Sequence, residues 1–253
     1  MNKVKELLEA GEPALGTWVT IQHPDVSEIL STLPFDWLMF DMEHAPADIS
    51  TLETMLPAVD EDHVIPFVRV PWNDIVWIKR VLDVGVKGIL VPYVSTKAEA
   101  KKVVNACQYP PRGIRGVGPR RAINYGEKDR EDYYDRFEGN LVIGVQVETP
   151  EALANLDEIL SVEQIDMAFI GPNDLSANLG VYRQFASSKY RKAVDKVLAT
   201  CKEKKVAPGI FSGDPSEITA QIKNGFQFIS IAADYGSLRS TYANILRELR
   251  EIG

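Results

Sequence analysis

The sequence is poor in cysteine and has no long apolar run, and each shortage excludes a class of protein. Only Cys107 and Cys201 occur among the 253 residues, each inside a segment of helical period, which argues against a disulfide framework. No stretch approaches the roughly 18 apolar residues that a membrane span needs. The charged, amphipathic residues 1–10 also lack the apolar centre of a signal peptide. We therefore expect a cytoplasmic protein with no membrane partner.

Positive net charge is missing as well. The chain has 28 Lys and Arg against 36 Asp and Glu, a net charge of −8 and a pI near 5.1. Nucleic-acid-binding domains are usually basic overall or along one face, so we expect no nucleic-acid partner. Hydrophobic residues make up 45% and charged residues 25% of the chain, which are ordinary values for a globular protein with a sizeable core.

The chain does contain a regular alternation of short apolar runs with longer segments of helical period. Strands are predicted near 15–20, 36–41, 64–69, 88–92, 141–147, 165–170, 206–211 and 226–232. Helices are predicted near 24–32, 49–59, 73–84, 96–107, 150–160, 187–204, 214–224 and 237–251. A strand followed by a helix eight times predicts an α/β protein with one (β/α)8 barrel domain over residues 1–253.

Residues 108–140 interrupt this alternation. The segment is rich in Pro, Gly, Arg and Tyr, and it is too long for an ordinary connection between a helix and a strand. Long loops in compact domains are usually functional. We expect this one at the active-site mouth or at a subunit interface, with its arginines facing an anionic substrate tail or a neighbouring subunit.

Polar residues follow several predicted strands. In a parallel barrel the carboxyl ends of all strands meet at one rim, where the chemistry of such barrels takes place. One acid at a strand end is more often a helix cap or a solvated charge, but several at one rim favour a site. The residues expected at the rim are Trp18, Gln22, Asp41, Glu43, His44, Arg69, Gln146, Glu148 and Asp174.

Glu148 and Asp174 lie 26 residues apart, about one strand–helix unit. They supply hard oxygen ligands, and water and substrate oxygens would complete the coordination, which is typical of Mg²⁺ or Mn²⁺. Zinc would recruit His or Cys. The alternative interpretation is that Asp174 caps a short helix that begins at Leu175, and the two roles are compatible.

His44 follows Asp41 by three residues on a predicted strand-to-loop turn. A carboxylate bonded to one ring nitrogen would leave the other nitrogen free to exchange protons. Arg69 lies in an apolar strand and needs an anion, either a structural partner such as Glu43 or an oxyanion that develops during a reaction. No Lys is expected to project from a strand into the mouth, so metal-assisted enolisation is favoured over imine chemistry.

Five ordered motifs carry a resemblance to a known family. They are Phe35–Pro46, Val68–Pro71, Gly113–Gly118, Gln146–Thr149 and Gly171–Ser176. Together they resemble the metal-dependent class II pyruvate aldolases of the HpcH/HpaI family, and the likeness extends from Leu15 to about Asp234. The resemblance implies a (β/α)8 barrel of the phosphoenolpyruvate/pyruvate type that reversibly cleaves a 4-hydroxy-2-oxo acid to pyruvate and an aldehyde.

The resemblance also implies roles for individual residues. A divalent cation, Mg²⁺ or Mn²⁺ with Co²⁺ as a further option, would bind to Glu148 and Asp174. His44, oriented by Asp41, would transfer protons, and Arg69 would stabilise the enolate oxygen. The pyruvyl group would meet Gln146, Trp18 and the backbone amides of Asn173 and Asp174. A homo-oligomer is implied, typically a hexamer built as a dimer of trimers, with the last helices exchanged between subunits.

Two departures from the family pattern leave the aldehyde unidentified. Asn173 stands where many relatives have Ala, and Gly118–Arg121 differs from the usual loop. Two other uses of the same fold stay open at this point. One is an oxaloacetate decarboxylase or macrophomate-synthase-like enzyme that forms the same enolate, and the other is a non-catalytic 2-oxo-acid binding protein.

Overall fold

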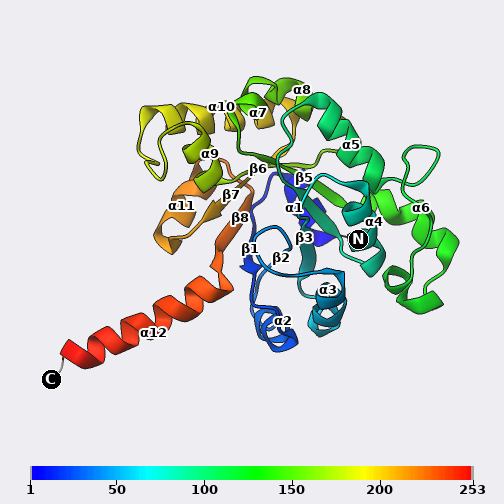
Figure 1. Cartoon of the computed structure of the whole chain (residues 1–253), viewed down its shortest axis with the longest axis horizontal. Helices are drawn as coiled ribbons and strands as arrows, with labels where there is room; N and C mark the ends of the chain where they lie inside the picture. Colours follow the sequence, from blue (N-terminus) through cyan, green and yellow to red (C-terminus); the bar gives the residue numbers. More distant parts are fainter. Residues whose placement is uncertain (1, 252–253) are drawn as a thin grey trace.

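Each of the eight predicted apolar runs forms a strand in the computed structural model, which describes residues 2–251 (Figure 1). Every strand pairs in parallel with its neighbours in chain order, and β8 pairs with β1 to close the barrel. The predicted (β/α)8 architecture is therefore confirmed. The strands are β1 Ala14–Val19, β2 Trp37–Asp41, β3 Ile65–Arg69, β4 Gly88–Val91, β5 Val142–Val147, β6 Met167–Ile170, β7 Ala207–Ser212 and β8 Phe228–Ala233.

The predicted helices are also present, with ends shifted by a few residues. They are α2 Pro24–Ser31, α3 Ile49–Met55 with the 3₁₀ turn η1 Leu56–Ala58, α4 Ile75–Val84, α5 Lys97–Cys107, α7 Pro150–Ala154, α8 Leu156–Leu160, α10 Ser188–Lys204, α11 Pro215–Lys223 and α12 Asp234–Glu251. Three further elements were not predicted, namely α1 Lys3–Ala10, the 3₁₀ segment η2 Arg121–Gly126 and α6 Arg130–Asn140. The short helix considered at Leu175 is α9 Pro172–Asn178, which begins three residues earlier.

Large aromatic side chains fill the inside of the barrel. Trp37 stacks on Phe228 with ring centroids 4.0 Å apart, and Phe67 packs against both rings. The neighbouring positions have to be glycine, because a Cβ at Gly16 would lie 2.1 Å from Trp37 and a Cβ at Gly88 would lie 2.0 Å from Phe67. This aromatic layer forms a solid floor below the carboxyl ends of the strands.

A second apolar layer lies between the strands and the surrounding helices, and it makes up most of the core. It includes Cys107 and Cys201, which are both free and buried, so the expectation that no disulfide frames the fold is confirmed for these two residues. Within residues 2–251, no helix is long and apolar enough to cross a membrane.

Residues 108–140 lie away from the barrel mouth, contrary to one of the two expectations for this segment. Arg121 donates to the carbonyl of Val84 at the carboxyl end of α4, which is the end of that helix remote from the mouth. Arg115 is fully buried between the rings of Tyr109 and Phe137, each with its centroid 4.5 Å from the guanidinium carbon. The segment is thus anchored to its own barrel, and a place at a subunit interface stays a prediction.

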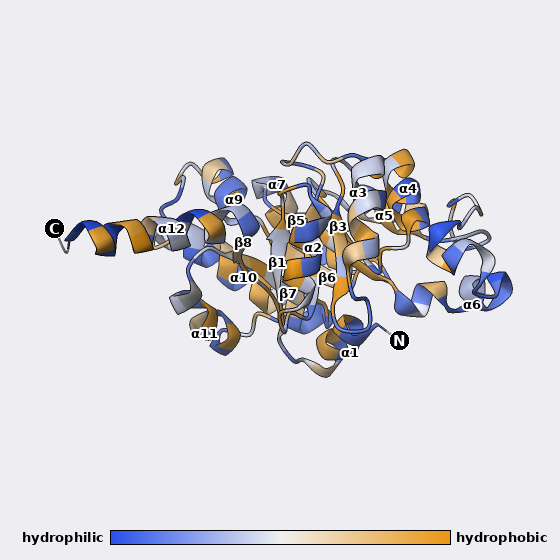
Figure 2. Cartoon of the chain, turned by 90° about the horizontal axis from the view of Figure 1, so that it is seen from below, coloured by the Kyte–Doolittle hydropathy of each residue, from blue (hydrophilic) through white to orange (hydrophobic). Residues whose placement is uncertain are grey.

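Helix α12 extends outward from the barrel instead of packing along it (Figure 1). Figure 2 shows hydrophobic residues along this helix where it stands clear of the other elements. Among its described residues only Asp234 is buried, whereas six large apolar side chains are between 45% and 62% exposed. These are Tyr235, Leu238, Tyr242, Ile245, Leu246 and Leu249.

Candidate active site

A cavity of about 580 Å³ opens at the carboxyl ends of the strands. Its lining contains most of the residues that the sequence assigned to a site, from β1, β2, β3, β5 and the start of α9: Trp18, Asp41, His44, Arg69, Gln146, Asn173 and Asp174. The cavity lining includes no lysine, in agreement with the argument against an imine mechanism. The predicted rim is therefore a real concave surface.

The carboxylates of Glu148 and Asp174 converge over Gly171. A Cβ at Gly171 would lie 3.1 Å from Glu148 Oε2 and 3.7 Å from Asp174 Oδ2, so both oxygens face the small space above this glycine. Asp174 lies in the first turn of α9, and that helix begins at Pro172 with Gly171 as its N-cap and no side-chain cap. The interpretation of Asp174 as a cap is therefore wrong, and its carboxylate is not used for capping.

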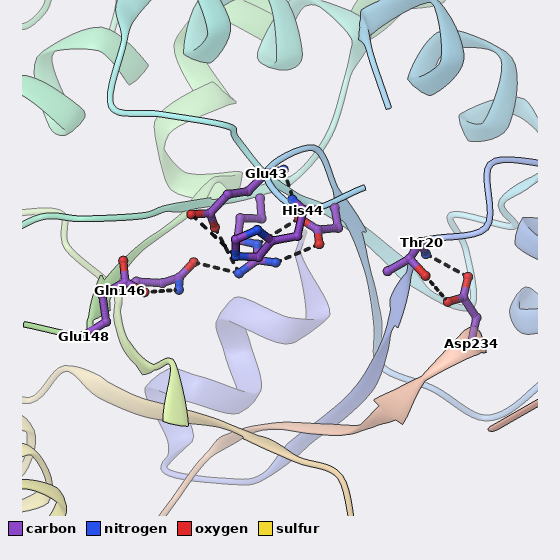
Figure 3. Close-up of polar contacts among 8 residues, drawn as sticks. Thr20, Glu43, His44, Gln146, Glu148 and Asp234 are labelled. Carbon is purple, nitrogen blue, oxygen red and sulfur yellow. Dashed lines mark hydrogen bonds and ion pairs between the residues drawn. The ribbon is translucent and has the colours of Figure 1, made fainter. Parts of the chain in front are cut away.

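Neighbouring groups fix the orientation of Glu148. Its Oε1 accepts from the backbone N–H of Tyr93 at 2.7 Å. Its Oε2 accepts from the side-chain amide of Gln146 at 2.9 Å (Figure 3). Tyr93 adopts a left-handed backbone conformation with φ of 52°, which is uncommon for a residue other than glycine. Such strain is typical of functional sites, and here it directs an N–H at a buried carboxylate.

Negative charge is concentrated at this point. Burial raises the pKa of Glu148 to about 7, and the Glu43 and Asp174 carboxylates also raise it. Burial likewise raises the pKa of Glu43 to about 7, with Arg69 opposing this effect and Asp41 and Asp174 adding to it. A cluster of buried carboxylates with too little positive charge fits a divalent cation, and its hard oxygen donors suit Mg²⁺ or Mn²⁺.

The cluster has fewer protein ligands than a closed metal centre. Within the described part of the chain, no group of three or more His, Cys, Asp and Glu is arranged to hold a metal ion. A site with Glu148 and Asp174 as its two protein ligands agrees with this, because water and substrate oxygens would occupy the other positions. The residues present therefore fit an open cation site and do not fit a structural one.

Arg69 connects the two sides of the site. Its guanidinium makes two bonds to Asp41, at 2.9 and 2.7 Å, and an ion pair with Glu43 at 3.0 Å. The same guanidinium lies over the ring of Trp18 at 4.2 Å. The structural partner expected for Arg69, Glu43, is present, and Asp41 is a second partner that was not expected. Both carboxylates hold the guanidinium at the cavity wall.

The contact between Asp41 and His44 differs from the prediction. Asp41 Oδ1 accepts from the backbone N–H groups of Glu43 and His44, at 3.0 and 3.3 Å, and both of its oxygens are bonded to Arg69. Asp41 therefore shapes the turn that carries His44 and does not bond the imidazole. The imidazole is 63% exposed, and its Nε2 lies 4.0 Å from Glu43 Oε1. It faces the cavity with room to meet a ligand.

Sequence reasoning gave Glu43 no role of its own. It was considered only as a partner for Arg69, yet its charge also raises the pKa of Glu148, and the Asp174 charge raises the pKa of Glu43. The signal for this was available, because Glu43 follows the end of β2 by two residues and was expected at the same rim. The apolar wall was also missed: Phe169 and Phe211 each meet Trp18 edge-on, with centroids 5.9 and 6.3 Å apart.

Comparison with known proteins identifies the family of the chain. The family model described as HpcH/HpaI aldolase/citrate lyase matches residues 14–241. The chain belongs to the HpcH/HpaI aldolase/citrate lyase family. The family resemblance carried by the five motifs is thereby confirmed.

Several aldolases are similar to this protein over nearly its whole length. The hydroxypyruvate/pyruvate aldolase of Sagittula stellata is 39% identical over 240 residues, which is 94% of each chain. The 4-hydroxy-2-oxo-heptane-1,7-dioate aldolase of Shigella flexneri is 38% identical over 92% of this chain and 87% of its own. The crystal structure of a family protein from Burkholderia cenocepacia J2315 superimposes with a TM-score of 0.94 at 31% identity, covering 99% of this chain and 100% of that one.

Proposed function

We propose that the protein is a metal-dependent aldolase that reversibly cleaves a 4-hydroxy-2-oxo acid into pyruvate and an aldehyde. Two of its similar relatives are named as aldolases, one for hydroxypyruvate and pyruvate and one for a 4-hydroxy-2-oxo dioate. The observation that carries the proposal is the convergence of the Glu148 and Asp174 carboxylates over Gly171, at the edge of the cavity that Arg69, Gly171 and Asp174 line.

Glu148 and Asp174 would hold the divalent cation, for which Mg²⁺ and Mn²⁺ are the first candidates and Co²⁺ the third. The cation, when bound, supplies a Lewis acid for the 2-oxo group of the substrate. Tyr93 and Gln146 keep Glu148 aimed at the space above Gly171, and this orientation by neighbours is typical of metal ligands. A Cβ at Gly171 would lie 3.1 Å from Glu148 Oε2, so a side chain at this position would crowd the space that the cation needs.

Arg69 would place positive charge where the enolate oxygen develops. Its guanidinium is buried and already oriented by Asp41 and Glu43, so it needs no rearrangement during the reaction. Gln146 lies beside it, with Oε1 3.4 Å from Arg69 Nη1, and would orient the pyruvyl group. The first backbone N–H groups of a helix have no partner within the helix, so those of Asn173 and Asp174 in α9 would receive the substrate carboxylate.

His44 would move the proton at the other end of the reacting bond. In the cleavage direction its imidazole takes the proton of the 4-hydroxyl group, the bond between C3 and C4 breaks, and the electron pair passes to the 2-oxo group. A proton from solvent water then adds to C3 and completes pyruvate, and the exposed His44 imidazole returns its own proton to solvent. Asp41 positions His44 through its backbone N–H, and the exposed imidazole can reach an aldehyde at the open end of the cavity.

We also propose that α12 is exchanged between subunits of a homo-oligomer, in a hexamer built as a dimer of trimers. Six exposed apolar residues follow a helical spacing of three and four along α12, which is the pattern of a helix that buries one face. Burying one such side chain at an interface would stabilise the assembly by about 1.5–3 kcal/mol. Since the described residues of its own chain leave this face uncovered, a second copy is the partner that fits a helix of this kind.

A pyruvate-release assay over a set of 4-hydroxy-2-oxo acids tests the proposed function. The metal-free protein is expected to be inactive after EDTA treatment, and Mn²⁺ or Mg²⁺ should restore pyruvate release. The exposed lysine variant Lys202→Ala, far from the mouth in α10, serves as a control that should respond as the wild type does. Activity that survives chelation would refute the metal mechanism, and no release from any acid together with tight pyruvate binding would indicate a binding protein.

A further inference from the structure

The junction between β1 and β8 contains a buried carboxylate that the proposed chemistry does not use. Asp234, the first residue of α12, accepts from the backbone N–H groups of Thr20 and Ile21, both at 2.7 Å. Its other oxygen accepts from the Thr20 hydroxyl at 2.6 Å (Figure 3). The same oxygen accepts from the N–H of Tyr235 at 2.8 Å. Asp234 is 8% exposed, and no Lys, Arg or His among the described residues forms an ion pair with it.

A bulge next to this carboxylate turns the end of β8. The register between β1 and β8 shifts between Gly16 and Trp18, and Ala232 adopts a left-handed conformation with φ of 61°. The Thr17 hydroxyl donates to the carbonyls of Ile231 and Ala232, at 3.1 and 3.3 Å. Bulges of this kind redirect a strand at barrel rims and beside active sites. Here the redirected chain becomes α12, and Asp234 ties its first turn to the end of β1.

The tied segments form one wall of the mouth. Thr20, Ala233 and Tyr235 line the cavity. Figure 3 shows Thr20 and Asp234 across the barrel from Glu148, which follows β5. A 2-oxo acid held at Glu148 and Asp174 therefore directs its far end towards β8, β1 and β2. This far end is the part that leaves as the aldehyde.

We propose that Asp234 is a positioning residue for the aldehyde half of the substrate. It acts through Thr20 and Tyr235, because its four accepted hydrogen bonds set the distance between the end of β1 and the start of α12. The same contacts set the direction in which α12 leaves the barrel, so the shape of the aldehyde pocket and the path of the protruding helix are fixed together. This proposal rests on the proposed aldolase function.

Asp234→Asn is the decisive variant, because an amide of the same size cannot accept all four hydrogen bonds. Its NH₂ group would face N–H donors on at least one side, and the wall would shift. We expect the KM for the aldehyde in the addition direction to rise about tenfold or more. Exchange of the C3 protons of pyruvate with D₂O needs the cation site, Arg69 and a proton acceptor at C3 but no aldehyde, so it should change less than about twofold.

Two further variants keep the test informative if Asp234→Asn folds poorly. Thr20→Val removes only the hydroxyl and should raise the aldehyde KM by a smaller factor, and Thr20→Ser should restore it. Asp48→Asn is the matched control, because Asp48 caps α3 with a similar set of hydrogen bonds, to Ser50 and to the N–H and hydroxyl of Thr51, and is absent from the cavity lining.

The outcomes separate this proposal from the proposed function. If the wild type neither releases pyruvate nor exchanges its protons, the aldolase assignment fails. If the wild type is active and Asp234→Asn has an unchanged aldehyde KM, the positioning role is refuted. An equal loss of proton exchange and aldehyde addition in both Asp234→Asn and Thr20→Val would also overturn it, because it would show only general damage to the barrel.

Discussion

Gly171→Ala should remove the cation site while leaving the fold intact. The new methyl group would lie 3.1 Å from Glu148 Oε2, 3.2 Å from Gln146 Nε2 and 3.7 Å from Asp174 Oδ2. A bound Mg²⁺ or Mn²⁺ needs oxygens at roughly 2.0–2.2 Å, so the methyl group and the ion compete for the same space. We expect the Kd for Mn²⁺ to rise at least about 100-fold, which corresponds to about 3 kcal/mol.

The same substitution should cost little stability. Gly171 has φ of −83° and ψ of 96°, which alanine adopts without strain. Replacing glycine by alanine at a compatible position lowers the entropy of the unfolded chain and stabilises a protein by about 0.4–1 kcal/mol. The close contacts at 3.1 and 3.2 Å offset some of this gain, so the thermal midpoint should stay within a few degrees of the wild type.

Mn²⁺ binding can be measured on the metal-free protein from the electron paramagnetic resonance signal of the free ion, with the melting temperature recorded in parallel. Gly139→Ala in α6 is the matched control, because a Cβ at that position meets nothing within 4 Å. It should bind Mn²⁺ as the wild type does. Wild-type affinity in Gly171→Ala would show that the ion does not lie between Glu148 and Asp174, and the reasoning about the site would then be wrong.

Two other predictions concern protonation and assembly. Burial raises the pKa of Glu148 to about 7 in the metal-free protein, and the cation needs the carboxylate form. Mn²⁺ affinity, measured by calorimetry, should therefore rise up to tenfold per pH unit below pH 7 and level off above it. Glu148→Gln should bind Mn²⁺ weakly at every pH. An affinity that does not change with pH in the wild type would contradict this prediction. The double variant Ile245→Glu with Leu249→Glu should lower the mass measured by light scattering, because it places charge in the apolar stripe of α12. Ser240→Glu, on another side of that helix, should leave the mass unchanged, and an unaltered mass in the double variant would remove α12 from the interface.

The repeating part of the fold could be predicted because each strand and each helix carries its own pattern. A parallel strand such as Met167–Ile170 is buried on both faces, so all of its residues have to be apolar. This pattern can be recognised within the strand itself. Helix α1 was missed because it precedes the first strand and stands outside the repeat. Its residues Val4 and Leu8 are buried against the inner cluster of the barrel, which is a contact between distant parts of the chain.

The site could be predicted as a set of residues but not as a set of contacts. The strand ends determine which side chains reach the rim, so Glu148, Asp174, Arg69 and Gln146 were expected there. Which carboxylate Arg69 bonds is decided by the register of β2 against β3, which places Asp41 beside Arg69. Because Asp41 and His44 are close in sequence, a bond from Asp41 to the imidazole was expected. In the structure the side chain of Asp41 instead bonds Arg69 on the neighbouring strand.

Residues 108–140 show a different limit. Their arginines suggested a ligand, but Arg115 is buried between two aromatic rings and bonds Asp83 at 2.6 Å. A buried guanidinium and an exposed one look the same in a sequence, because the packing that distinguishes them comes from other elements, here Asp83 in α4 and Phe137 in α6. Asp234 could not have been recognised for the same reason, since its partners precede it by more than 200 residues.

The stacked rings of Trp37 and Phe228 have a consequence for the order of events during turnover. Because they block passage along the barrel axis, both products must depart through the opening by which the substrate arrived. Glu148 is almost completely inaccessible to solvent, whereas the His44 imidazole is well hydrated, so the pyruvyl end is the inner one. Cleavage is therefore expected to follow an ordered kinetic scheme in which the aldehyde dissociates first and pyruvate last.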